Sequence, residues 1–123
     1  MKILITGATG LVGKEIGKAL FAKGHDLVVV SRNPHNAQKN LPFPCEIIKW
    51  QGESEDFPLK ALEGTEALIH LAGESIGEGR WSTQRKKAIE NSRVLGTRMI
   101  VEALKKQKQE GTLTLKSFIS TSA

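Results

Sequence analysis

The chain has 123 residues, 39% of them hydrophobic and 25% charged, with a formal net charge of +5. This length fits one domain, and this composition excludes a disordered tail. One cysteine, Cys45, excludes an internal disulfide, and the chain has neither a signal-peptide core nor an apolar run of ~18 residues that would span a membrane. We therefore expect a soluble, cytoplasmic protein with no membrane partner. The positive charge fits a nucleic-acid surface and a pocket for a phosphorylated small molecule equally well.

Short apolar runs alternate with helical patterns along the chain. The apolar runs predict buried strands at residues 2–7, 25–31, 45–49, 66–73 and 113–120. A first helix is expected over residues 11–23, with its apolar stripe at Val12, Ile16, Ala19 and Leu20. The longest helical pattern covers residues 82–109, with its stripe at Ala88, Leu95, Met99, Ile100, Ala103 and Leu104. Loops with short helices are expected at residues 32–40 and 51–65.

Strands that alternate with helices indicate an α/β fold, in which a parallel sheet is covered on both faces and connected by right-handed crossovers. Five strands in this style make most of a doubly wound domain. Because the full arrangement normally has about six or seven strands, we expect this sheet to stop before its last strands.

The first turn, ITGATGLVG, places Gly7, Gly10 and Gly13 three apart between a predicted strand and a predicted helix. In a dinucleotide site, Gly7 permits the sharp turn, Gly10 permits close approach of a pyrophosphate, and Gly13 lets the helix lie close to the sheet. Amides at the helix start then face the phosphates. A flexible turn is the alternative, but the flanking strand and helix favour a cofactor site. The phosphate loop of nucleotide triphosphatases is excluded by Ala8 and Glu15, where that motif needs Gly and Ser or Thr.

The end of the second strand indicates which dinucleotide is bound. NAD requires an acid about 20 residues beyond the glycines, which accepts a hydrogen bond from the ribose 2′-hydroxyl. This chain has Ser31, Arg32 and Asn33 there. The planar cation of Arg32 suits a 2′-phosphate, with Ser31 and Asn33 as helpers, and a solvated loop arginine is the alternative. We therefore predict that NADP(H) is preferred over NAD(H).

Several segments together resemble one family: TGATGLVG, LAGE after the fourth strand, GRWS, NSRVLGTR and STSA. They are similar to the short-chain dehydrogenase/reductase superfamily, in its extended NAD(P)-dependent epimerase/dehydratase type, and most similar to a bacterial branch labelled sugar-nucleotide epimerase-like. The resemblance covers essentially the whole chain. It implies a Rossmann-type sheet and hydride transfer on a nucleotide-sugar or a related hydroxyl or carbonyl substrate.

The resemblance also implies roles for single residues. Ser122 matches the serine that binds the reacting substrate oxygen, and a frayed terminal hydroxyl is the alternative. Gly96 and Thr97 match positions where the long helix packs closely, which is expected to offset the helix cost of Gly96. Arg93 stands where many relatives carry asparagine. The expected cofactor-binding residues are Thr6, Gly7, Gly10, Leu11, Val12, Gly13, Ser31, Arg32, Asn33, Leu71, Ala72, Gly73, Glu74 and Arg93.

The Tyr-x-x-x-Lys pair of the family has no counterpart here, because the chain contains no tyrosine. In relatives, as the resemblance implies, the lysine lowers the pKa of the tyrosine, which exchanges a proton during hydride transfer. We therefore interpret residues 1–123 as the N-terminal NAD(P)-binding domain of a longer enzyme, inactive alone and lacking the substrate domain. The alternative is a nonenzymatic NADP(H)-binding redox sensor. A sheet that stops early also predicts self-association through the exposed edge of the fifth strand.

The remaining residues give weaker signals. Basic clusters at residues 85–87 and 105–109 share a helix with an apolar stripe, so a solvated face fits them better than a nucleic-acid surface. The histidines lack ligand spacing with Cys45, so no metal is expected, and His70 is expected to be structural. Arg80 and Trp81 follow the fourth strand and either line the nicotinamide or substrate side or anchor the loop.

Overall fold

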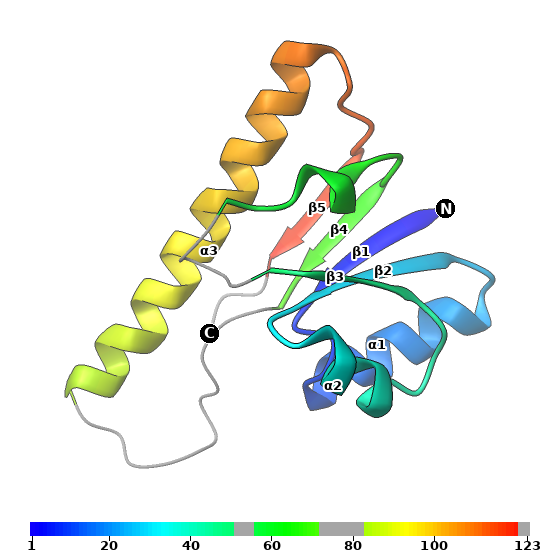
Figure 1. Cartoon of the computed structure of the whole chain (residues 1–123), viewed down its shortest axis with the longest axis horizontal. Coiled ribbons are helices and arrows are strands. Elements are labelled where there is room, and N and C mark those ends of the chain that lie inside the picture. Colours follow the sequence, from blue (N-terminus) through cyan, green and yellow to red (C-terminus); the bar gives the residue numbers. More distant parts are fainter. Residues whose placement is uncertain (51–55, 72–82, 121–123) are drawn as a thin grey trace.

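The computed structural model describes residues 1–50, 56–71 and 83–120, with the backbone alone for residues 83–95. Its strands are β1 (Lys2–Thr6), β2 (Asp26–Ser31), β3 (Glu46–Lys49), β4 (Ala67–His70) and β5 (Ser117–Ser120). Its helices are α1 (Leu11–Ala22), α2 (Pro34–Asn40), α3 (Thr83–Glu110) and the 3-10 helix η2 (Leu59–Leu62). All strand pairs are parallel, in the order β3-β2-β1-β4-β5 (Figure 1). This confirms the predicted Rossmann-type doubly wound sheet of five strands.

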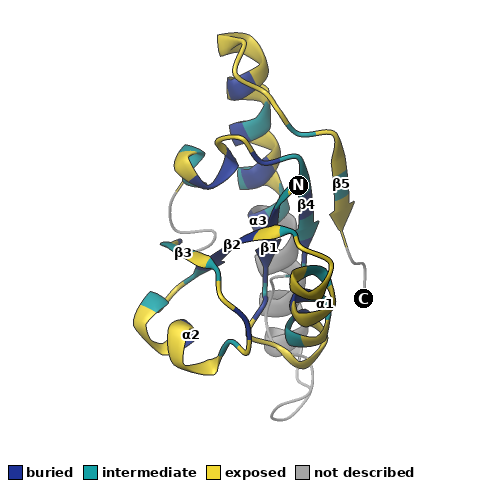
Figure 2. Ribbon diagram, turned by 90° about the vertical axis from the view of Figure 1, so that its right-hand side faces the viewer, coloured by how far each residue is buried: buried dark blue, intermediate teal, exposed yellow. Residues whose placement is uncertain are grey.

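The sheet separates two apolar clusters, because successive side chains of a strand point to opposite faces. Leu4 of β1 packs in one cluster with Ile100 of α3. Ile3 and Ile5 pack in the other cluster, against which Leu20 of α1 lies. Figure 1 shows α3 and α1 on opposite sides of the sheet, and Figure 2 shows buried residues concentrated in the central strands while β5 and α2 are largely exposed. Burial of each large apolar side chain contributes about 1.5–3 kcal/mol, so the two clusters hold the helices to the sheet.

The short helix expected within residues 32–40 is well formed as α2. The Asn33 Oδ1 accepts a hydrogen bond from the Asn36 amide at 3.1 Å, and Pro34 occupies the first helical position, where its missing amide donor has no cost. The strand that follows, β3, lies at an edge of the sheet. An edge position agrees with the prolines at 42 and 44, which have no amide to pair.

The apolar stripe predicted for α1 is partly wrong. Val12 is 62% exposed and Ala19 is also exposed, whereas the buried positions of the helix are Gly13 and Gly17. The ring of Phe43, which precedes β3 and is itself buried, lies so close to Gly17 that a Cβ there would clash with it. A large aromatic side chain therefore fills the space that a small residue on the helix leaves, and spacing of apolar residues alone does not reveal this.

The stripe predicted for α3 holds where side chains are described. Ile100 and Ala103 are buried, and Met99 and Leu104 are partly buried against the same cluster. Gly96 is buried against Trp50. A Cβ at this position would lie 3.7 Å from the indole, which is an ordinary contact. The packing at Gly96 is therefore less close than expected and leaves room for a methyl group. No helix within the described ranges is both long enough and apolar enough to span a membrane.

Two glycine-to-alanine substitutions should therefore have opposite effects on stability. Gly17→Ala should lower the free energy of unfolding by about 1–3 kcal/mol, because the Phe43 ring must move. Gly96→Ala should raise it by roughly 0.5–1 kcal/mol, because alanine favours the helix and fits beside Trp50. Urea unfolding followed by circular dichroism measures both. Equal losses for the two variants would contradict the contacts described here.

Candidate functional site

The carboxyl ends of all five strands lie at one edge of the sheet, because the strands are parallel. At this edge β1 and β4 are neighbours although they are not consecutive in the chain. The helix after β1 packs on one face of the sheet, and the long helix after β4 packs on the other. In doubly wound sheets ligands bind at such a switch point, outside the carboxyl ends of the strands. The candidate site therefore comprises the residues around the ends of β1, β2 and β4.

A glycine-rich turn joins β1 to α1 at this edge. Gly7 has a φ of 73°, a left-handed conformation that glycine adopts without strain, and its carbonyl oxygen accepts a hydrogen bond from the Gly10 amide at 3.2 Å. Gly10 is the N-cap of α1 and provides no side-chain cap, and the first turn of the helix carries no acidic residue. The start of α1 therefore presents backbone donors and the positive end of the helix dipole to an anion.

Gly13 and Gly10 of the turn differ in whether packing within the protein requires a glycine. A Cβ on Gly13 would lie 2.7 Å from the Ala8 Cα and would also clash with the Gly7 carbonyl oxygen, both of which are backbone atoms. Gly13 therefore lets α1 lie against the turn itself. A Cβ on Gly10 would lie 3.5 Å from the Gly7 carbonyl oxygen, an ordinary contact, so the protein's own packing does not require glycine there.

Two apolar side chains are exposed beside the amide donors of α1. Leu11 is 83% exposed and Val12 is 62% exposed. Water contact with two large aliphatic side chains in one helical turn is unfavourable, and a ligand that covers them would gain about 25 cal/mol for each Å2 of apolar surface removed from water. The first turn of α1 thus offers an anion site and an apolar surface side by side.

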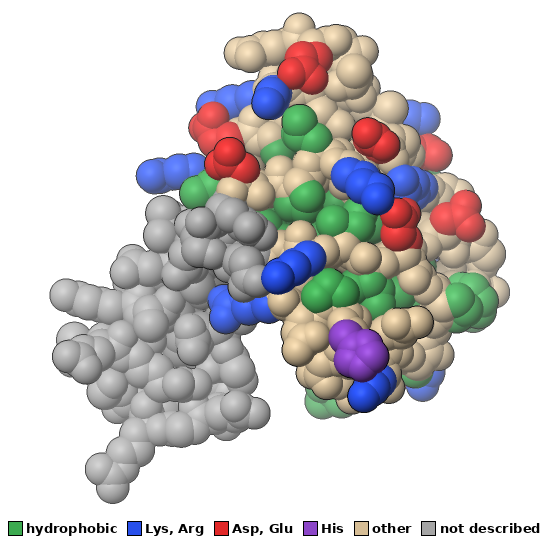
Figure 3. Space-filling view, in the orientation of Figure 1, with side chains coloured by type: hydrophobic (Ala, Val, Ile, Leu, Met, Phe, Trp, Pro, Cys, Tyr) green, Lys and Arg blue, Asp and Glu red, His purple; other side chains and the backbone are tan. Residues whose placement is uncertain are grey.

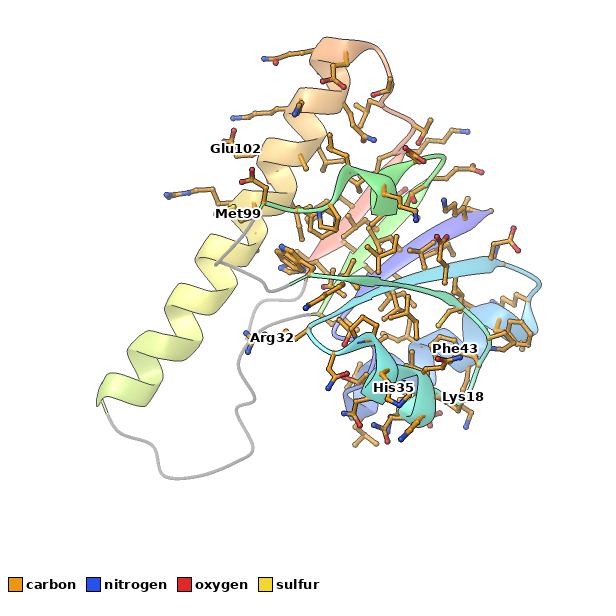
Figure 4. All side chains as sticks on the ribbon, in the orientation of Figure 1. Lys18, Arg32, His35, Phe43, Met99 and Glu102 are labelled. Atoms are coloured by element: carbon orange, nitrogen blue, oxygen red, sulfur yellow. The ribbon has the colours of Figure 1, made fainter. Side chains whose placement is uncertain are left out.

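The end of β2 carries the polar residues expected to recognise a phosphate. The Ser31 Oγ accepts a hydrogen bond from the Asn33 amide at 3.2 Å, and the Asn33 Oδ1 caps α2. Arg32 is exposed and makes no ion pair with any described residue. Figure 4 shows Arg32 pointing outward from the end of β2, away from α1 and α2. Its guanidinium therefore has no acidic partner among the described residues, while the two predicted helpers already make local hydrogen bonds.

A hydrogen-bonded pair that the sequence did not reveal joins β1 to β4 at the switch point. The Thr6 Oγ1 lies 2.6 Å from the His70 Nδ1, and the same hydroxyl oxygen accepts a hydrogen bond from the Leu71 amide at 3.0 Å. Thr6 and His70 are register partners, and both are buried, with 0% and 4% exposure. Burial lowers the pKa of His70 below its usual value, because desolvation disfavours the imidazolium. The sequence placed the two residues in separate predicted strands and indicated a structural role for His70, but it did not pair these strands with each other.

Charged side chains are distributed unevenly over the molecule. On the face shown in Figure 3, acidic side chains lie together with several Lys and Arg side chains over the part nearer the amino ends of the strands, whereas the described charged side chains near the carboxyl ends are Lys, Arg and His. Among the strands themselves, β2 begins with Asp26 and β3 with Glu46, and no described strand ends on a carboxylate. Among the described residues, the side chains around the carboxyl ends of the strands are therefore more positive than those around the amino ends.

Several predicted site residues lie outside the described residues: Ala72, Gly73, Glu74, Arg80, Trp81 and Ser122. For Arg93 the helix backbone is described without its side chain.

Within the described chain, no three His, Cys, Asp or Glu side chains are grouped as a metal ion would need. Burial raises the pKa of the Cys45 thiol, which makes this half-buried side chain a weak nucleophile near neutral pH.

Comparison with known proteins gives consistent results. The model of the NAD dependent epimerase/dehydratase family matches residues 3–123. The chain is similar to epimerase family protein YfhF of Bacillus subtilis, with 34% identity over 111 residues, which are 89% of this chain and 35% of the relative. It is similar to epimerase family protein SDR39U1 of Homo sapiens, with 29% identity over 89% of this chain and 33% of the relative. The chain thus spans about a third of the length of the curated relatives it matches.

Solved structures share the fold. The crystal structure of human epimerase family protein SDR39U1 (isoform 2) with NADPH has a TM-score of 0.70 and 28% identity, and covers 98% of this chain and 36% of that chain. MoeE5 in complex with UDP-glucose and NAD has a TM-score of 0.72 and 23% identity, and covers 100% of this chain and 36% of that chain. At the latter identity the likeness shows the fold alone.

The buried His70 predicts a loss of stability in acid. Because its pKa is lowered in the folded state, the unfolded chain binds the proton more readily, and stability is lost as the pH falls below about 6.5. The contribution of this one group is at most about 1.4 kcal/mol for each pH unit. Urea unfolding of His70→Asn between pH 7.5 and 5 should show a shallower dependence than the parent chain. His35→Asn, a change at an exposed histidine of α2, is the control, and an equal slope for His70→Asn and the parent would contradict the prediction.

Proposed function

The chain belongs to the NAD dependent epimerase/dehydratase family, and on this premise we propose that it binds NADP(H) at the carboxyl edge of its sheet, as the dinucleotide-binding part of an oxidoreductase. The observation that supports this most directly is the contrast between Gly10 and Gly13. Packing within the protein accounts for Gly13 but not for Gly10, so a ligand that approaches the backbone at Gly10 explains the second glycine. The NADPH in the human relative's structure is consistent with this proposal.

The pyrophosphate would be held by main-chain amides of the first turn of α1. These donors have no side-chain cap, and the helix dipole favours an anion at this end. The exposed Leu11 and Val12 give the cofactor apolar surface next to the phosphates. Thr6 and His70 would act indirectly, because they keep the ends of β1 and β4 together beneath the ligand.

The 2′-phosphate would be recognised by Arg32. Its guanidinium is exposed at the end of β2, lacks an acidic partner among the described residues, and matches a phosphate with two parallel N–H donors. The position also lacks the acid that would accept a hydrogen bond from the ribose 2′-hydroxyl of NAD. We therefore propose a preference for NADP(H) over NAD(H).

The reaction proposed for the whole protein is hydride transfer on a nucleotide-sugar or a related hydroxyl or carbonyl compound. A bound nicotinamide would supply the hydride acceptor or donor. Within this chain, Ser122 is proposed to hold the reacting substrate oxygen by a hydrogen bond, as its match to the family serine implies. We further propose that residues 1–123 are the cofactor-binding domain of that protein and that it works in the cytoplasm, as its single cysteine suggests.

Calorimetric titration with NADPH and NADH tests the cofactor. We expect the chain to bind NADPH more tightly than NADH, and we expect Arg32→Ala to weaken NADPH binding by roughly ten- to a hundredfold, which is about 1.5–3 kcal/mol for a charge-assisted contact, with little effect on NADH. Gly10→Val should weaken both dinucleotides because its side chain would occupy the path of the pyrophosphate. Thermal unfolding of Gly10→Val within a few degrees of the parent would show that the loss arises at the site. Binding of neither dinucleotide by the parent chain would overturn the proposal.

Self-association is proposed through the outer edge of β5. Among the described strands, β5 pairs with β4 alone, and Ile119 on it is 55% exposed. Unpaired backbone donors and acceptors on an edge strand favour pairing with another strand. Light scattering at increasing concentration should show dimers or larger species, and Ile119→Lys should reduce them. A monodisperse monomer over the whole range would contradict this prediction.

A further inference from the structure

A lysine at the end of β3 lies at the same carboxyl edge as the candidate site. Lys49 is the last residue of β3, and it is the register partner of Ser31, the last residue of β2. Adjacent strands of a sheet are about 4.8 Å apart, so the backbone of Lys49 lies directly beside the residue that precedes Arg32. The pairing continues one step further, because the Trp50 amide donates to the Ser31 carbonyl oxygen at 2.9 Å. The end of β3 is thereby fixed against the end of β2.

Alternation along the two strands places Lys49 and Ser31 on the same face of the sheet. Val29 and Ile47 pack in the cluster on the α1 face, and the residues two positions further along are Ser31 and Lys49. Lys49 is exposed and makes no ion pair with a described residue. The acid of the same strand, Glu46, stands at the opposite end. Lys49 thus adds a second cation to the carboxyl edge on the α1 face, whereas Arg32 at the end of β2 points away from α1, and neither has an acidic partner among the described residues.

We propose that Lys49 is a second cation for the 2′-phosphate of NADP(H) and so determines cofactor specificity together with Arg32. This inference rests on the proposed function. A phosphate monoester carries a charge of about −1.5 to −2 at neutral pH, which a single guanidinium does not neutralise. The ammonium of Lys49, on a flexible four-carbon stem, supplies a point charge from β3, while Arg32 supplies the fixed two-donor contact from β2.

A lysine on an edge strand has one other physical explanation, because such charges discourage edge-to-edge pairing of sheets. That role requires a charge but no ligand, and it changes association of the protein rather than its choice of dinucleotide. The two explanations therefore differ in what the substitution of Lys49 changes.

The test compares Lys49→Met with Lys23→Met, which removes an exposed lysine just after α1, at the opposite end of the helix from the glycine turn. Calorimetric titration of each chain with NADPH, NADH and 2′,5′-ADP gives the affinities. Lys49→Met should raise the Kd for NADPH and for 2′,5′-ADP by roughly three- to tenfold, as expected for one exposed charge contact, and leave the Kd for NADH unchanged within about twofold. Lys49→Arg should restore NADPH binding, and Lys23→Met should alter none of the three.

The outcomes separate this inference from the function on which it rests. Unchanged NADPH affinity in Lys49→Met, or an equal loss for NADPH and NADH, overturns the role of Lys49 while NADP(H) binding by the parent chain stands. Increased light scattering by Lys49→Met with unchanged affinities assigns the lysine to protection of the edge and also overturns the inference. Failure of the parent chain to bind any of the three ligands overturns both proposals.

Discussion

The contact of α1 with the backbone of its own preceding turn is the constraint on which the site depends. Gly13 has no side chain, and the helix can therefore lie against Gly7 and Ala8 without a clash. This contact fixes where the first turn of α1 begins relative to the end of β1, and hence where its uncapped amides and its dipole are directed. An alanine in place of Gly13 would displace the helix start before any ligand was present. The positive φ of Gly7 acts in the same way, because it directs the chain from the strand into that turn.

A polar pair holds the neighbouring strand ends in an otherwise apolar sheet. Thr6 and His70 are both buried, and in such a position an unpaired hydroxyl or imidazole would cost about 1–3 kcal/mol. Their hydrogen bond removes that cost only when β1 and β4 are in register. The Leu71 amide, which donates to Thr6, extends the constraint to the first residue after β4. The pair therefore favours one alignment of the two strands between which the chain changes faces, and burial, which lowers the pKa of His70, favours its uncharged form.

The sequence predicted the elements of this fold better than their contacts. Short apolar runs, separated by helical patterns, identified all five strands. In β1 and β2 the run is continuous because both faces of these strands are buried. Glycine spacing located the turn because the backbone conformation at Gly7 is a local property. The side of α1 that faces the sheet was misjudged, since Gly17 gives no apolar signal and its partner Phe43 is distant in the sequence. The Thr6–His70 pair was missed for the same reason: strand register, which brings two residues 64 positions apart together, is not encoded within either strand alone.

The net charge is compatible with both a nucleic acid and a phosphorylated small molecule as the partner. The positions of the charges favour the small molecule. Along α3, Lys105 lies 3.9 Å from Glu102, so part of the basic surface of that helix is locally balanced. At the carboxyl edge of the sheet, Arg32 and Lys49 are exposed without described acidic partners, and the positive end of the α1 dipole lies at the same edge. A few cations grouped at one edge of the sheet act together on a small anion, whereas a long polyanion must contact an extended positive surface. The arrangement therefore suits a compact ligand with several phosphates. The grouping of a few cations around the strand ends supports a dinucleotide, whereas the formal net charge of +5 does not distinguish the two kinds of partner.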